Sequence, residues 1–120
     1  MPHIVFNERV DLEKIQERFK PMIEKDDNLI KIKEVYVSSA KNNALFHAIT
    51  IGEINQEFFI EVLTGDCKTT VRLFPLTDPK KTDSVKKSLV IVSRFIVTQH
   101  PSLKITKTNL QEYLSGAPLH

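Results

Sequence analysis

Residues 83–99, DSVKKSLVIVSRFIVTQ, decide the fold of this chain. Seven of the nine residues from Leu89 to Val97 are apolar. On a helix, one apolar stripe of this segment can lie on a sheet, and it comprises Val85, Leu89, Val92 and Ile96. Four further apolar residues lie outside that stripe: Val90, Ile91, Phe95 and Val97. The segment therefore predicts a core helix with apolar surface left over for another contact.

A strand is the rival interpretation of the same segment, because Val, Ile, Phe and Thr dominate residues 89–98. A helix is favoured because Asp83 and Ser84 are good capping residues. The whole segment also exceeds the length of a typical strand, about 5–6 residues. His100 and Pro101 then end the predicted helix.

Upstream of this helix, apolar residues alternate with polar ones. Runs rich in β-branched and aromatic residues predict strands at 29–38, 44–51, 56–64 and 68–74. The connections are short, and in the first of them, residues 41–43, Asn42 and Asn43 tolerate the positive φ of a tight turn. Short connections make neighbouring strands antiparallel. We therefore expect a four-stranded meander. A bulge is expected at Glu34, where the alternation of apolar and polar residues shifts by one position.

The two ends of the chain add shorter elements. Residues 3–6 predict a brief strand, and Asp11 is a preferred N-cap for a helix. The apolar residues of that helix recur at spacings of three and four: Leu12, Ile15, Phe19, Met22 and Ile23. Pro21 is expected to kink or end it. Residues 108–111 form a capping-box pattern, which predicts a short helix through Leu114.

Together these elements predict an α+β fold with the order β-α-β-β-β-β-α and a short C-terminal helix. Two helices should cover one face of the four-stranded antiparallel meander, in a single domain over 1–114 with a frayed tail at 115–120. Over residues 3–99 this element order resembles one repeat of the TATA-box-binding-protein fold. The resemblance is one of element order without a shared motif, so it implies a curved sheet backed by helices and no functional residue.

Composition narrows the class of protein. Of 120 residues, 41% are hydrophobic and 27% charged, which is typical of a soluble globular domain. No apolar run approaches the roughly 20 residues of a membrane span, and no signal pattern begins the chain. The single cysteine, Cys67, favours a reducing compartment, so we expect a cytoplasmic protein that does not act at a membrane. The chain has three glycines and four scattered histidines, so we expect no glycine-rich phosphate-binding loop, no metal site and no cofactor.

The strand pattern also predicts an outward face that is not fully polar. Phe58, Ile60 and Val62 alternate with Glu57 and Glu61, so the former should face the core. Phe59 and Leu63 share the outward side with the two glutamates. With the surplus residues of the long helix they form the predicted interface set: Val90, Phe95, Val97, Phe59 and Leu63. This set predicts a homo-oligomer or a protein partner.

Basic residues suggest a different partner. They are concentrated in the second half of the chain, and the candidates for contact with nucleic-acid phosphates are Lys31, Lys33, Lys68, Arg72, Lys80, Lys81, Lys86 and Lys87. If these share one sheet face with Phe59, that face would bind phosphates and stack on bases. The competing interpretation is an ordinary solvated surface.

An enzymatic alternative depends on Pro2. Removal of Met1 would expose a secondary amine, which can act as a base or nucleophile when its pKa is lowered. The opening residues 1–5, MPHIV, resemble the tautomerase superfamily, whose terminal proline is the acid-base residue. The resemblance implies a keto–enol isomerase with Lys31 or Lys33 as the nearby cation. After five residues it ends, because those enzymes continue with repeated β-α-β units and an active-site arginine.

Three functions therefore stay open. The first is a non-enzymatic binding or assembly module, in which nucleic acid is one possible partner. The second is a tautomerase-like isomerase with Pro2 as its catalytic residue. The third is a structural or regulatory protein with no small ligand.

Overall fold

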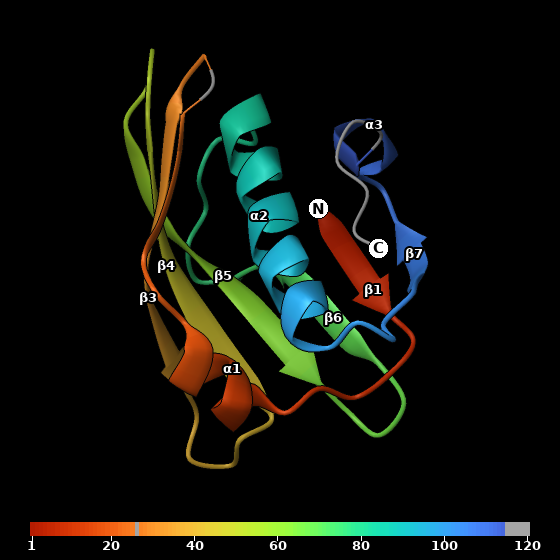
Figure 1. Ribbon diagram of the computed structural model, residues 1–120. Helices are drawn as coiled ribbons and strands as arrows, with labels where there is room; N and C mark the ends of the chain where they lie inside the picture. The colour runs from red at the N-terminus through yellow and green to blue at the C-terminus, as the bar shows by residue number, and fades with distance from the viewer. Residues whose placement is uncertain (26, 115–120) are drawn as a thin grey trace.

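The four predicted strands of the meander form the middle of a larger antiparallel sheet (Figure 1). The computed structural model describes residues 1–25 and 27–114. Over these residues the sheet has seven strands in the order β2-β3-β4-β5-β6-β1-β7. The strands are β1 His3–Phe6, β2 Met22–Lys25, β3 Leu29–Val37, β4 Asn43–Ile51, β5 Gln56–Thr64, β6 Thr69–Leu73 and β7 Ile105–Thr108. The α+β fold and the antiparallel meander are as predicted.

The segment at 83–99 is a helix, α2 Asp83–Gln99, and it lies across one face of the sheet (Figure 1). Its N-cap is Thr82, whose side chain accepts a hydrogen bond from the Val85 backbone N–H. All four residues of the predicted stripe are fully buried. We call the face under α2 the inner face. It holds the largest side chains of the core: Ile4, Phe6, Ile32, Phe46, Phe58, Ile60 and Leu73.

The first helix is shorter than its apolar spacing predicts. α1 Leu12–Arg18 begins at the predicted cap Asp11, but Phe19 already has an extended backbone. Met22 and Ile23 belong to β2, which pairs with β3. The physical reason is Pro21, because proline has no N–H and pushes the residue before it out of the helical region. The prediction of a helix through Ile23 is therefore wrong, although Phe19 still packs edge-on against Phe46 in the core.

The C-terminal segment adds a strand that no pattern predicted. β7 pairs with β1, and Thr108 then begins α3 Gln111–Leu114 by accepting a hydrogen bond from the Leu110 N–H. β7 reads Ile-Thr-Lys-Thr and has a single apolar residue, so its alternation is too weak to identify. The predicted tail at 115–120 lies outside the described residues.

Two local predictions in the meander have different outcomes. The register of β3 against β4 shifts between Ile32 and Glu34, which confirms the predicted bulge. In the turn after β3, Lys41 takes the positive φ of 62°, and neither asparagine does. Asparagine propensity therefore located this turn, but the left-handed residue was assigned wrongly.

The surplus apolar residues of α2 are mostly used inside this chain. Val90 is 2% exposed and Val97 is 3% exposed, so neither is an accessible position for a partner. The C-terminal segment folds back beside α2 (Figure 1), and its Leu103 and Leu110 join the same core. Phe95 is half-buried and lies edge-on to Phe19. Most of the predicted surplus therefore fills the contact between α2 and the rest of the chain.

Candidate functional site

The opposite side of the sheet, here called the outer face, is the candidate site. No described helix packs on it, since α1, α2 and α3 all lie on the inner side (Figure 1). Alternation along β3 to β6 places the following residues on this face: Lys31, Glu34, Tyr36, Leu45, His47, Ile49, Glu57, Phe59, Glu61, Leu63, Thr70 and Arg72. Apolar and aromatic side chains therefore occupy much of a sheet face on which no described helix packs.

Three rings on adjacent strands form a cluster in the middle of the outer face. His47 of β4 and Phe59 of β5 are direct cross-strand neighbours, and their rings stack with centroids 5.2 Å apart. Tyr36 of β3 meets Phe59 edge-on at 6.4 Å. Tyr36 is 55% exposed, so the cluster has one strongly accessible member. Such contacts hold aromatic rings in fixed positions on the pleated surface.

Beside the rings lies an ion pair that is partly withdrawn from water. Arg72 Nε and Nη2 donate to Glu61 Oε1 at 3.1 and 2.9 Å. Asn43 Nδ2 donates to the other Glu61 oxygen at 3.3 Å. The Glu61 side chain is only 6% exposed. A carboxylate this buried is tolerated because several donors satisfy it.

A histidine–carboxylate contact lies next to Phe59. His47 Nε2 and Glu57 Oε2 are 2.5 Å apart. The His47 ring therefore both stacks on Phe59 and has a carboxylate partner. Two of the charged groups on the outer face, Arg72 and Glu57, are therefore already engaged with neighbours on the same face.

The eight basic candidates do not gather on one surface. Lys31 and Arg72 lie on the outer face, Lys33 is at the bulge of β3, and Lys68 lies in the connection before β6. Lys80 and Lys81 precede α2, and the Lys81 ammonium is 3.3 Å from Asp78. Lys86 and Lys87 are on α2, on the other side of the sheet, where the Lys86 ammonium lies 5.7 Å from the centre of the Tyr113 ring.

Pro2 does not lie beside the cation that a tautomerase-like site would use. Pro2 is buried, and the Asn109 side chain holds the terminus by hydrogen bonds to the Met1 carbonyl and the His3 N–H. Lys31 and Lys33 are on β3, whereas Pro2 precedes β1, and three strands lie between β3 and β1. The tautomerase resemblance stays a prediction without a matching arrangement of residues.

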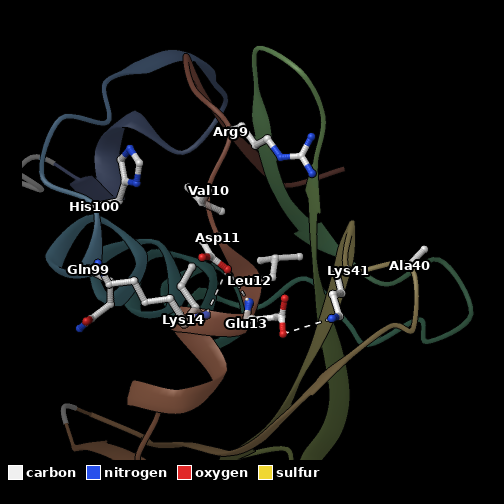
Figure 2. Close-up of a pocket in the computed structure, with 11 residues that line it drawn as sticks. Arg9, Val10, Asp11, Leu12, Glu13, Lys14, Ala40, Lys41, Gln99 and His100 are labelled. Carbon is white, nitrogen blue, oxygen red and sulfur yellow. Dashed lines mark hydrogen bonds and ion pairs between the residues drawn. The ribbon is translucent and has the colours of Figure 1, made fainter.

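A hollow of about 710 Å³ lies on the inner side, between the start of α1, the turn after β3 and the end of α2 (Figure 2). Most of its charged groups have partners within the chain. Figure 2 shows Glu13 reaching Lys41 and Asp11 capping α1. The Glu13 oxygen and the Lys41 nitrogen are 3.2 Å apart. At the edge of the hollow, hydrogen bonds from His100 and Ser102 lower the pKa of Glu8. These groups join loops to helices, and the ammonium of Lys14 is the remaining charge in the lining.

Two kinds of site are not found in the part of the chain that the structure describes. Over residues 1–25 and 27–114, no three His, Cys, Asp or Glu side chains are close enough to hold a metal ion. Within the same residues, no helix is long and apolar enough to cross a membrane. Cys67 is exposed and has no cysteine partner.

Comparisons with models of protein families, with curated proteins and with solved structures find no match to this chain. The resemblance in element order to a TATA-box-binding-protein repeat therefore stays a prediction. Functional conclusions depend on the residues of the outer face themselves.

Sequence reasoning identified part of that face and missed its centre. Phe59 and Leu63 were placed outward by alternation, and both lie on the outer face. Tyr36 was missed as a member of the cluster. The sequence does place it outward, because it alternates with Val35 and Val37, which face the core. His47 was missed as well, because its contact with Phe59 requires the register of β4 against β5.

Proposed function

We propose that this chain is a non-enzymatic binding or assembly module and that another protein docks on its outer face. The observation that carries the proposal is the bare sheet face, where Leu45, Ile49 and Leu63 lie around the cluster of Tyr36, His47 and Phe59. Contiguous apolar surface rimmed by polar groups is typical of interaction sites. The exposed Cys67 fits a reducing compartment, such as the cytoplasm, as the place of action.

A protein partner fits the charges of this face better than a nucleic acid does. Docking of a protein removes water, which costs little where charged groups already have partners, as in the pairs Arg72–Glu61 and His47–Glu57. Phosphate binding needs cations that are free to form new contacts. The charge of Arg72 is already balanced by the buried Glu61, which weakens its attraction for a phosphate.

Site-specific photocrosslinking in the source cells tests this proposal. A photoreactive phenylalanine analogue replaces Tyr36 on the outer face, and a matched control carries it at the exposed Glu17 on α1. We expect a covalent adduct with protein, either a second copy or another chain, at Tyr36 and not at Glu17. Equal labelling at both positions, or no protein adduct at Tyr36, would contradict the proposal.

Single-stranded nucleic acid is the second candidate, and the aromatic cluster is the observation in its favour. Tyr36 and Phe59 lie on an open sheet face, where bases can stack on exposed rings. Lys31 lies on the same face, two strands away from Phe59. Stacking contributes about 1–3 kcal/mol per base. Fluorescence anisotropy of labelled single strands should then show binding that weakens with salt and is lost in Tyr36→Ala. No anisotropy change at low salt removes this candidate.

A further inference from the structure

The register of β3, β4 and β5 indicates which protein docks on the outer face. We propose that two copies of this chain associate through their outer faces about a two-fold axis that runs along β4. This pairing rests on the proposed function, because it uses the same face, and it adds the identity of the partner and the symmetry.

Opposite charges flank the central strand at one level of the sheet. Lys31 of β3 and Glu57 of β5 are both direct cross-strand neighbours of Ile49. Neighbouring strands are about 4.8 Å apart, so the two charged residues are separated by about 10 Å within one copy. Lys31 and Glu57 of the same copy do not form an ion pair with each other, and Glu57 contacts His47 instead.

A two-fold axis along β4 brings these charges together between copies. The axis exchanges the β3 side of one copy with the β5 side of the other. Lys31 then lies opposite Glu57 of the second copy, and Glu57 lies opposite Lys31 of the second copy. The Glu57 side chain is 63% exposed and contacts His47 through Oε2, so its other carboxylate oxygen can accept from Lys31 of the second copy. Leu45 and Ile49 of β4 lie near the axis and meet their own equivalents in an apolar centre. The face is thereby self-complementary, as an interface between identical surfaces requires.

The size of the face is compatible with a weak dimer. β3, β4 and β5 have nine residues each, and the two-fold axis along β4 places these three strands opposite those of the second copy. From strand spacing and rise, the shared patch measures about 15 Å by 30 Å, or about 450 Å² per copy. Two copies then bury about 900 Å² in total, which is in the range of weak, transient interfaces.

Charge reversal tests both the face and the symmetry by sedimentation velocity at low salt. Lys31→Glu places two acids at each contact, and Glu57→Lys places two lysines there. Each single variant should therefore dimerise at least about tenfold more weakly than the unmodified chain. Mixing the two variants should restore association as a heterodimer, because every contact then joins a glutamate to a lysine. Only an arrangement with residues 31 and 57 opposite each other predicts this rescue.

Matched controls separate the contact from changes in net charge or folding. Lys14→Glu and Glu17→Lys on exposed α1 change the net charge equally and should leave the dimer affinity unchanged. Circular dichroism melting of all four variants confirms that they are folded. A dimer whose affinity neither reversal changes, or no heterodimer on mixing, would overturn the proposed pairing.

The failure of this pairing is distinguishable from failure of the proposed function. If the unmodified chain is strictly monomeric while Tyr36 crosslinks to a different protein, the second copy is excluded and the docking face stands. If the chain is monomeric and Tyr36 yields no protein adduct, both are overturned. A self-adduct at Tyr36 together with rescue on mixing supports both.

Discussion

The two faces of the central sheet are formed by the same strands but differ in composition and in what covers them. Along β5, Phe58, Ile60 and Val62 point inward and are at most 1% exposed, whereas Phe59 and Leu63 point outward and are half-buried. The inner face is apolar and is covered by α2. The outer face mixes rings, aliphatic residues and a buried ion pair under no described helix. This mixed composition is the basis of the proposed docking function.

The largest difference between the faces should appear when one phenylalanine is removed from each. Phe46 is fully buried on the inner face, so Phe46→Ala should lower the free energy of unfolding by about 3–5 kcal/mol. Phe59→Ala on the outer face should cost about 1 kcal/mol, because the site is open and water can fill it. Urea unfolding at low protein concentration measures both. Equal costs would show that the outer face is packed as tightly as the inner one.

The ion pair is the feature of the outer face that should resist change most. Arg72→Ala removes the main donor of the Glu61 carboxylate, which is 6% exposed in the unmodified chain, so we expect a loss of about 2 kcal/mol. Arg72→Lys keeps the charge but not the two-nitrogen contact, and its cost should be smaller. The same unfolding assay applies. An Arg72→Ala variant as stable as the unmodified chain would mean that Glu61 is not held by this contact.

On the inner side, one polar group should be removable with a gain in stability. Ser93 on α2 is fully buried, and its hydroxyl has no hydrogen-bond partner among the described residues. Ser88 is equally buried but donates to the Val85 carbonyl at 2.5 Å. Both changes to Ala bring the same gain in helix propensity, so Ser93→Ala should be more stable than Ser88→Ala by about 1 kcal/mol. Thermal and urea unfolding of the pair measure this difference, and the opposite order would contradict it.

The smallest expected effect concerns the contact between α3 and α2, on the inner side of the sheet. The Tyr113 hydroxyl of α3 donates to Asp83 Oδ1 at 2.6 Å, which raises the pKa of Tyr113 to about 12. The pKa of an unperturbed tyrosine is 10.0. The stabilisation from the Tyr113–Asp83 hydrogen bond is therefore complete below pH 10.0 and is lost as the pH rises to about 12. In a Tyr36→Phe background Tyr113 is the sole tyrosine, so ultraviolet titration reads it alone.

Asp83→Asn in that background removes the charge that favours the protonated tyrosine, so the titration midpoint should fall toward 10.0. An unchanged midpoint would show that α3 is not held to α2 by this hydrogen bond. Since the contact belongs to the inner side, dimer affinity through the outer face should not change.

Residue pattern alone determined the inner face. The stripe Val85, Leu89, Val92 and Ile96 and the alternation through β3 to β6 identify core residues, because burial of one face imposes the period of its element on the sequence. The bulge near Glu34 followed from the same rule. β2 and β7 were not predicted, because a strand of four residues shows too little periodicity. In β2 it did not outweigh the competing helical spacing, and in β7 it did not outweigh the polar composition.

Tertiary structure alone decided what lies next to what. The sequence shows that Phe59 points outward, but its contact with Tyr36 and His47 depends on the register of three strands. Lys31 and Glu57 are 26 positions apart, and only pairing with Ile49 from both sides places them at one level of the sheet. Likewise, Val90 and Val97 are apolar by sequence, but whether a partner or the chain's own C-terminal segment covers them depends on long-range packing. Local pattern records which way a side chain points, whereas its neighbours are set by contacts between distant segments.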